Sequence, residues 1–218
     1  MTKPRVIETD QGIRGETNVN LYDQMQRGLR DKGWIATKDI IKSGITGGMA
    51  LEIGPGPGYL GLEWLKNTQG TSLKGLDISP GMIDLAKRNA AEYGFSERVQ
   101  YVPSSGDKMP FNDEEFNAVF SNGSLHEWSN QGNTFNEICR VLKKGGRVFV
   151  SDLRRDMFCL MKWFIWLNSK PKEIRAGFIT SVNAAYTPDE VRELLKGTKL
   201  QGCTVSGNPV GLRLTGVK

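Results

Sequence analysis

The sequence predicts an α/β protein with a doubly wound, mostly parallel seven-stranded sheet, helices on both faces and a C-terminal antiparallel hairpin. Short apolar runs alternate with amphipathic segments between residues 49 and 153, which is typical of a parallel sheet. A glycine-rich turn joins the first apolar run to the helix after it, as at the start of a nucleotide-binding fold. Two final apolar runs are separated only by Gly207-Asn-Pro209, which favours an antiparallel pair.

Length and composition favour a single globular domain. The chain has 218 residues, of which 38% are hydrophobic and 24% charged, enough for one well-buried core. No apolar stretch has the length of a transmembrane helix, and residues 1–5 lack the apolar core of a signal peptide. The three cysteines are scattered and form no CxxC pair, so we expect a reducing cytoplasm and no structural metal site.

The net charge of +5 is mild for a nucleic-acid-binding protein. The densest basic stretch consists of Arg140, Lys143, Lys144, Arg147, Arg154 and Arg155. Lys143 and Lys144 fall near the end of a predicted helix, where cations oppose the negative end of the dipole. We therefore interpret these residues as a solvated surface and expect no nucleic-acid partner.

The single domain, residues 1–218, divides into four predicted parts. Residues 1–45 form an N-terminal helical cap, 46–153 a cofactor-binding core, 154–186 an apolar helical lid or insertion, and 187–218 a helix plus the terminal hairpin. Within the cap, residues 1–18 are expected to be loose or to act as a flap. Residues 19–41 suggest two short amphipathic helices broken near Gly33, which either cover the ligand site or only pack.

The first unit of the core is a strand, a turn and a helix. Residues 49–53 form a buried strand that Glu52 interrupts. Three glycines at alternate positions follow, Gly54, Gly56 and Gly58, and without Cβ atoms their backbone can approach a ligand closely. The helix then covers residues 59–66.

The same alternation continues along the chain. Further strands are expected at residues 72–78, 99–102, 116–121 and 147–153, with the hairpin at 199–205 and 210–217. Further helices are expected at residues 80–93, 133–142 and 188–196. Two of these helices carry start signals, because Ser79-Pro80 and Thr187-Pro188 place a capping hydroxyl before a proline.

Polar residues and glycines gather at the carboxyl ends of the predicted strands. Right-handed crossovers bring these ends to one edge of the sheet, where ligands bind. The residues concerned are Glu52, Gly54, Gly56, Gly58, Asp77, Gly106, Asp107, Asn122 and Gly123. Asp77 suits the two hydroxyls of a ribose, a device that several nucleotide-binding families share.

The turn differs from the Gly-x-Gly-x-x-Gly pattern of dinucleotide-binding proteins. Glu52 beside it would repel a pyrophosphate but suits a ligand with an amino group or a cationic centre. Together with Asp77 and Asp107, this acid favours a cationic, phosphate-free nucleoside.

Residues 49–153 resemble the class I S-adenosylmethionine-dependent methyltransferases of the small-molecule, methyltransferase-11/UbiE-like type. The motifs that carry the resemblance are, in order, Leu51-Glu-Ile-Gly-Pro-Gly-Pro-Gly58, Gly75-Leu-Asp-Ile-Ser79 with Met82-Ile-Asp-Leu-Ala86, Ser105-Gly-Asp-Lys-Met-Pro-Phe111, residues 116–126, and Arg140-Val-Leu-Lys-Lys-Gly-Gly146. The terminal hairpin agrees, because the family carries an antiparallel seventh strand. The resemblance implies a Rossmann-like methyltransferase fold.

The resemblance also implies the cofactor, S-adenosyl-L-methionine, with S-adenosyl-L-homocysteine as the product. The three glycines of the turn would approach its methionine and ribose parts. Asp77 would hold the ribose hydroxyls, with Ile78 and Met82 against the adenine, unless these two apolar residues belong to the core. Asp107 would accept from the adenine amino group, and Asn122 and Gly123 would line the methionine moiety.

Transfer from a sulfonium is an in-line displacement, so a base is needed only for a hydroxyl or an acidic carbon. His126 is the only histidine and our candidate catalytic residue, with Glu127 and Tyr186 as weaker candidates. For the acceptor pocket we name Tyr22, Trp163 and Tyr186. The sequence Ser121-Asn-Gly-Ser124 lacks the Pro-Pro-aromatic signature of enzymes that methylate amino groups of bases or glutamine.

The apolar residues 157–167 have three interpretations: a core helix, a lid over an apolar acceptor, or a contact with a membrane surface. We expect a methyltransferase for a small-molecule, partly apolar acceptor that acts as a monomer or homodimer. The alternative is a non-catalytic nucleoside- or dinucleotide-binding module on the same fold.

Overall fold

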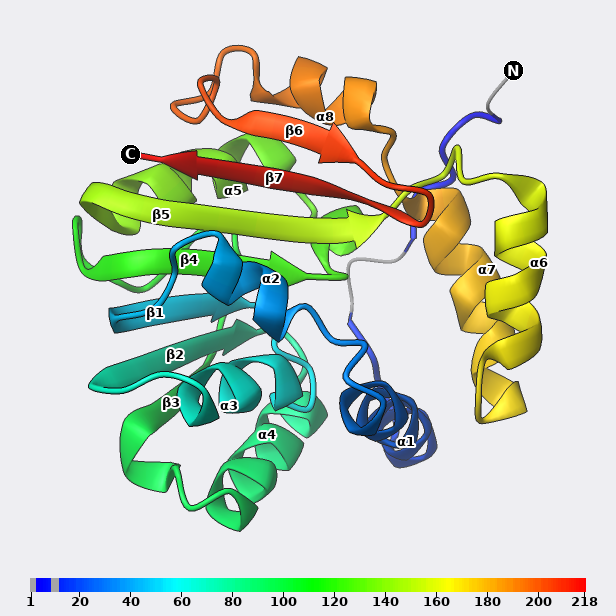
Figure 1. Cartoon of the computed structure of the whole chain (residues 1–218), viewed down its shortest axis with the longest axis horizontal. Coiled ribbons are helices and arrows are strands. Elements are labelled where there is room, and N and C mark those ends of the chain that lie inside the picture. The colour runs from blue at the N-terminus through cyan, green and yellow to red at the C-terminus, as the bar shows by residue number, and fades with distance from the viewer. Residues whose placement is uncertain (1–2, 9–11) are drawn as a thin grey trace.

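The computed structural model describes residues 3–8 and 12–218, and it contains the predicted doubly wound sheet (Figure 1). The strand order is β3-β2-β1-β4-β5-β7-β6, in which the first five strands are parallel and β7 pairs antiparallel with β5 and β6. The strands are β1 (Gly48–Ile53), β2 (Thr71–Asp77), β3 (Val99–Pro103), β4 (Phe116–Asn122), β5 (Leu142–Leu153), β6 (Thr204–Gly207) and β7 (Gly211–Val217).

Helices cover both faces of this sheet. They are α1 (Glu16–Asp31), α2 (Thr37–Lys42), α3 (Tyr59–Lys66), α4 (Pro80–Glu92), α5 (Gln131–Val141), α6 (Cys159–Asn168), α7 (Arg175–Ala184) and α8 (Pro188–Leu195), with short 3-10 turns η1 (Ser96–Arg98), η2 (Leu125–Glu127) and η3 (Lys172–Ile174). α2 and α3 pack on one face through a core that includes Ile40, Trp64 and Phe120. α5 and α8 pack on the other through Ile138 and Val191.

The helix starts predicted from Ser79-Pro80 and Thr187-Pro188 are confirmed. The Ser79 hydroxyl accepts from the Met82 amide (3.4 Å), with Pro80 at the first helical position of α4. Thr187 and Glu190 form a complete capping box at the start of α8. α1 and α2 are the expected pair of helices, and Gly33, with φ 67°, lies in the break between them.

The predicted starts of two strands are corrected, and one helix within the predicted lid or insertion at residues 154–186 had not been delimited. β5 begins at Leu142 instead of Arg147, because the predicted turn pairs with β4 through an irregular register. β6 begins at Thr204, so residues 199–203 form a turn instead of a strand. α7 was not predicted, because its apolar residues are interrupted by Gly177, Thr180 and Ser181 and show little helical periodicity.

α6 is a surface helix, so the interpretation of residues 157–167 as a core helix is wrong. No residue of α6 is buried, and Phe158, Leu160 and Trp163 are each more than half exposed. α6 and α7 lie beyond the carboxyl ends of the parallel strands, on the same side as α1 (Figure 1). Within the described part of the chain, no helix combines the length and apolarity that crossing a bilayer requires.

Candidate functional site

A cavity of about 380 Å³ opens at the carboxyl ends of β1, β2 and β4, where the sequence predicted a ligand site. We call it the strand-end cavity. Its walls are Gly12, Ile13, Tyr22, Ile53, Gly54, Gly56, Leu76, Asp77, Ile78, Met82, Ser104, Ser105, Gly106, Asp107, Gly123, Ser124, Glu127, Trp128, Ser129 and Thr134. The residues predicted to hold the cofactor that do line it are Gly54, Gly56, Asp77, Ile78, Met82, Gly106, Asp107 and Gly123.

The glycine turn forms the floor of the cavity because its backbone adopts conformations that other residues avoid. Gly54 and Gly56 have φ values of 68° and 53°. A Cβ atom on Gly54 would lie 2.7 Å from the Cβ of Ser124, which also lines the cavity. The turn therefore places bare peptide groups at the cavity surface, and the space above Gly54 is closed to any side chain.

Asp77 holds this turn and still faces the cavity. One carboxylate oxygen accepts from the Gly56 amide (3.1 Å) and the other from the Ser79 amide (2.9 Å). Burial raises the pKa of Asp77, and these backbone donors oppose that shift. Each oxygen keeps lone-pair capacity, so the carboxylate can also accept from two adjacent hydroxyls of a ligand.

The cavity lining also contains a second carboxylate and apolar side chains. Asp107 accepts a weak hydrogen bond from the Ser129 hydroxyl (3.4 Å). Ile78 is 40% exposed at the cavity, so ordinary core packing does not explain it. Met82 is 2% exposed and serves two roles, because it packs against Val19 as well as lining the cavity.

Glu52, predicted to contact the ligand, does not line the cavity. Strand alternation turns its side chain to the α3 face, where it is 1% exposed and accepts from the Gly61 amide. Burial, followed by the charge of Asp77, raises the pKa of Glu52 to about 8. The side chain is therefore mostly a neutral acid at pH 7, behind the cavity wall.

Gly58 and Asn122 also lie outside the cavity lining. Gly58 has φ 85° at the start of α3, and a Cβ there would lie 2.6 Å from the Tyr101 hydroxyl, so packing requires this glycine. The Asn122 side chain is exposed and accepts from the Ser151 hydroxyl (2.7 Å). The next residues of that loop, Gly123 and Ser124, line the cavity instead.

Of the three residues predicted for the acceptor pocket, only Tyr22 lines the strand-end cavity. α1 places it there, and burial raises the pKa of its hydroxyl. Trp163 is 57% exposed on α6. Tyr186 is buried beneath the guanidinium of Arg5, whose carbon lies 4.1 Å from the ring centre.

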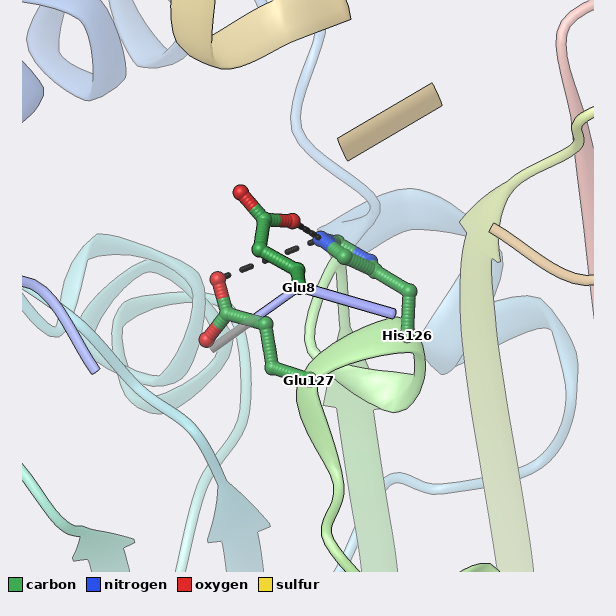
Figure 2. A group of neighbouring side chains, drawn as sticks. All are labelled: Glu8, His126 and Glu127. Atoms are coloured by element: carbon green, nitrogen blue, oxygen red, sulfur yellow. Dashed lines mark ion pairs between the residues drawn. The ribbon is translucent and has the colours of Figure 1, made fainter. Parts of the chain in front are cut away.

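His126 lies at one end of the cavity, behind Glu127. Its ring is 4% exposed, and its Nδ1 lies 2.8 Å from the nearer oxygen of Asp152, which also accepts from the His126 amide (2.9 Å). Its Nε2 points toward two carboxylates, at 3.5 Å from Glu8 and 3.9 Å from Glu127 (Figure 2). Only Glu127 of these four residues lines the cavity.

The ionisable side chains of this group shift one another's pKa values. Burial opposes a charge on His126, but the surrounding carboxylates, Asp152 first, raise its pKa to about 9. Burial raises the pKa of Glu127 to about 7, against the opposing effect of His126. Without a bound cation, His126 is therefore protonated at neutral pH and cannot accept a proton.

The N-terminal segment brings Glu8 to this group. The Val6 amide donates to the Asn183 carbonyl (3.1 Å) at the end of α7. Arg5 donates to the His126 carbonyl (2.8 Å), and buried Arg155 donates to the Lys3 carbonyl (2.8 Å). Residues 3–8 are therefore docked instead of loose, and the alternative that they act as a flap stays a prediction. Residues 1–2 and 9–11 lie outside the described residues.

Several cavity residues escaped the sequence analysis. Ser104 and Ser105 lie on the loop after β3, and Ser124, Trp128 and Ser129 lie on the loop after β4. Their position directly after two predicted strands could have identified them as cavity residues. Gly12 and Ile13 carried no such signal, because they are far in sequence from the strands that they reach. The same holds for Glu8, which lies outside the cavity lining, beside His126.

The charged and apolar side chains that line the cavity decide which ligands fit. Its described lining includes the carboxylates Asp77, Asp107 and Glu127, together with Ile78 and Met82, but no Lys or Arg. A pyrophosphate would meet acids without a compensating cation. A nucleoside that carries positive charge, with hydroxyls for one carboxylate and an amino group for another, matches the walls.

Comparisons with known proteins agree with this geometry. A methyltransferase domain profile matches residues 51–150. The chain is 28% identical over 182 residues to a ubiquinone/menaquinone biosynthesis C-methyltransferase of Geotalea daltonii, covering 79% of this chain and 76% of that protein. It is 36% identical over 84 residues to a sterol 4-C-methyltransferase of Caenorhabditis elegans, of which it covers only 25%.

Among solved structures, the fold is similar to that of a methyltransferase described as S-adenosylmethionine-dependent from Methanococcus maripaludis. The TM-score is 0.72 at 23% sequence identity, and the match covers 99% of this chain and 95% of the other. At this identity the likeness concerns the fold alone.

Proposed function

Because the chain belongs to the class I S-adenosylmethionine-dependent methyltransferases, we propose that it methylates a small-molecule, partly apolar acceptor. The observation that carries the proposal is the strand-end cavity, whose walls hold the glycine turn, three carboxylates and apolar surface but no described Lys or Arg. The reaction class follows from the family, and the small, partly apolar acceptor is proposed from the cavity.

S-Adenosyl-L-methionine would be held by residues with separate tasks. Asp77 would accept from the ribose hydroxyls, and Asp107 from the adenine amino group, with Ile78 and Met82 against the ring. The peptide groups of Gly54, Gly56 and Gly123 would face the methionine part. When bound, the cofactor supplies an electrophilic methyl group on a sulfonium, and S-adenosyl-L-homocysteine is the product.

The acceptor would bind at the end of the cavity formed by Tyr22 and Glu127. Asp152 fixes the ring of His126 behind this wall. His126 is outside the cavity lining, so its role in activating the acceptor would run through Glu127, the neighbour that reaches the cavity. Orientation of the acceptor and exclusion of water would supply the remaining rate enhancement.

We also propose that residues 154–186 act as the lid over the acceptor. The apolar surface of α6 supports this lid. α6 lies beyond the carboxyl ends of the parallel strands, on the same side of the molecule as α1 (Figure 1). An apolar lid suits a partly apolar acceptor. The same surface is compatible with the membrane contact considered above, and a vesicle-binding measurement would separate the two.

Two measurements test the function. Isothermal titration calorimetry should show binding of S-adenosylhomocysteine and none of NAD, and the reverse result would overturn the cofactor assignment. Turnover is then measured with S-adenosylmethionine labelled in its methyl group against a panel of phenols, enols, amines and thiols of graded apolarity. Binding without transfer to any of them would favour a non-catalytic nucleoside-binding module.

A further inference from the structure

Two buried polar atoms without hydrogen-bond partners face each other beside Glu127, outside the lining of the strand-end cavity. Nε2 of His126 and one Glu8 carboxylate oxygen are buried and have no hydrogen-bond partner, and they lie 3.5 Å apart (Figure 2). The His126 side chain is 4% exposed, and Glu127 approaches the same nitrogen at 3.9 Å. Buried polar atoms without partners are costly, so the arrangement calls for something between them.

A shared proton does not satisfy these atoms. Hydrogen bonds between nitrogen and oxygen have lengths of about 2.7–3.2 Å, and both separations from Nε2 exceed that range. With Nδ1 donating to Asp152, a neutral His126 directs the lone pair of Nε2 at two carboxylates. In the described part of the chain, neither Glu8 nor Glu127 has an ion pair with Lys or Arg.

The same separations suit a metal ion. One ligand atom from each of Glu8, His126 and Glu127 lies within 4.8 Å of the others. Zinc binds nitrogen and oxygen ligands at about 2.0–2.2 Å, which places neighbouring ligand atoms roughly 3–4 Å apart. The two glutamate side chains, 19% and 30% exposed, have room to close the remaining gap.

The residues around the cluster complete the pattern of a metal centre. A histidine ligand usually donates its second ring nitrogen to a carboxylate, which fixes the tautomer and aims the free nitrogen at the metal. Asp152, with a side chain 1% exposed, makes that contact with Nδ1. Arg5 donates to the His126 carbonyl and so fixes the backbone between the two elements that supply the ligands.

We propose that Glu8, His126 and Glu127 bind a divalent first-row transition-metal ion. One imidazole with two carboxylates favours Zn²⁺ or Mn²⁺ over Mg²⁺, which prefers oxygen ligands and keeps its water. Three protein ligands leave coordination positions open, as in catalytic rather than structural sites. Because Glu127 lines the cavity, an open position would be accessible from the acceptor end.

The role of the ion rests on the proposed function. An acceptor hydroxyl that binds a divalent ion ionises at a lower pH, and its proton leaves to solvent. The acceptor would then be an oxygen nucleophile or an enol whose adjacent carbon takes the methyl group. One bond from carbon to sulfur breaks and one bond from that methyl carbon to the acceptor forms, so no oxidant or reductant is needed.

Binding is tested without cofactor or acceptor. The full chain, stripped with EDTA and dialysed, is titrated with Zn²⁺ by calorimetry and with Mn²⁺ by electron paramagnetic resonance. One equivalent of each should bind, and Mg²⁺ should bind at least tenfold more weakly. No binding of Zn²⁺ or Mn²⁺ would overturn the site, and equally tight Mg²⁺ would overturn the assignment to a transition metal.

Variants locate the ion. Glu8→Gln and Glu127→Gln should each weaken Mn²⁺ binding by at least tenfold, whereas Glu16→Gln, at the exposed start of α1, should leave it unchanged. Asp152→Asn, a positioning variant, should weaken it about 10- to 100-fold. Circular dichroism verifies that each variant is folded, and metal binding that survives in folded Glu8→Gln and Glu127→Gln would overturn the assignment.

The experiments distinguish a failure of the metal proposal from a failure of the proposed methyltransferase function. If the EDTA-treated chain binds S-adenosylhomocysteine and transfers methyl groups at an undiminished rate, the activating role of the ion is wrong and the methyltransferase stands. If Mn²⁺ binds as expected but neither S-adenosylhomocysteine nor S-adenosylmethionine does, the metal site stands and the proposed function is wrong.

Discussion

The Glu52 carboxyl group lies against the backbone of Gly61, across the boundary between β1 and α3. A Cβ atom at Gly61 would lie under 3.0 Å from a Glu52 oxygen and from Leu73, so the helix approaches the strand this closely only with glycine there. That same oxygen, Oε2 of Glu52, is buried without a hydrogen-bond partner. This acid therefore forms part of the packing between strand and helix, and its protonation affects stability.

Glu52→Gln should stabilise the protein increasingly as pH rises. The native pKa of Glu52 is about 8 and the ordinary value is 4.5, so between these values the native state holds a proton that the unfolded state has released. The free energy of unfolding then falls with pH, by up to about 1.4 kcal/mol per unit. Glutamine cannot titrate and removes this loss.

Urea unfolding at pH 5, 6, 7 and 8 measures that difference. The gap between Glu52→Gln and the parent should widen up to about pH 8 and then level off. Glu97→Gln, at an exposed position in η1, serves as the control and should show no such trend. A gap that stays constant with pH would mean that Glu52 is ionised in the folded protein.

Asp77→Asn should weaken binding of S-adenosylhomocysteine by about 10- to 100-fold. Loss of a hydrogen bond to a charged group costs roughly 1.5–3 kcal/mol, and the amide of Asn also disturbs the donors from Gly56 and Ser79. Calorimetry gives the affinity. Asp84→Asn, on the exposed side of α4, should bind like the parent, and an unchanged affinity in Asp77→Asn would remove Asp77 from the site.

Comparing Gly54→Ala with Gly70→Ala distinguishes the effect of backbone strain from the effect of a side chain that fills the cavity. Both glycines have similar φ, 68° and 62°, so alanine costs each site about 1 kcal/mol of stability. Only at Gly54 would the new methyl group meet another residue of the cavity lining, Ser124, whereas nothing lies within 4 Å at Gly70. Cofactor affinity should fall only in Gly54→Ala. Equal affinities in the two variants would show that the turn is not the cofactor floor.

Trp163→Ala should cost less than about 1 kcal/mol of stability, because the side chain is 57% exposed. Trp64→Ala should cost about 3–5 kcal/mol, since Trp64 is fully buried and donates to the Ile45 carbonyl (2.8 Å). Urea unfolding compares them. The lid proposal further requires that Trp163→Ala lowers turnover of the acceptor without changing cofactor affinity, and unchanged turnover would contradict it.

The sheet was predictable because its information is local. Each parallel strand is a short apolar run beside a turn or a capped helix, and the resulting order places the strand ends together. The glycine turn, Asp77 and Asp107 could therefore be assigned to one cavity before any coordinates. α6 was ambiguous for the opposite reason: an apolar run of this length looks alike in a core and on a surface.

The orientation of individual side chains was harder to predict. Glu52 and Asp77 both stand near the ends of strands, yet alternation along β1 turns Glu52 toward α3 while Asp77 remains at the cavity. A metal site was not expected, since one histidine and no cysteine pair gave no ligand spacing. Glu8 lies more than a hundred residues from His126, and only the folded chain brings them together.

The docking of residues 3–8 also bears on when the site is completed during synthesis. Arg5 contacts Ala184, 179 positions later in the chain, so residues 3–8 can dock only after α7 has been made. The sheet from β1 to β5 can form before α7 has been made. Glu8 therefore joins His126 late, and a newly made chain would form its sheet before the group of Glu8, His126 and Glu127 is complete.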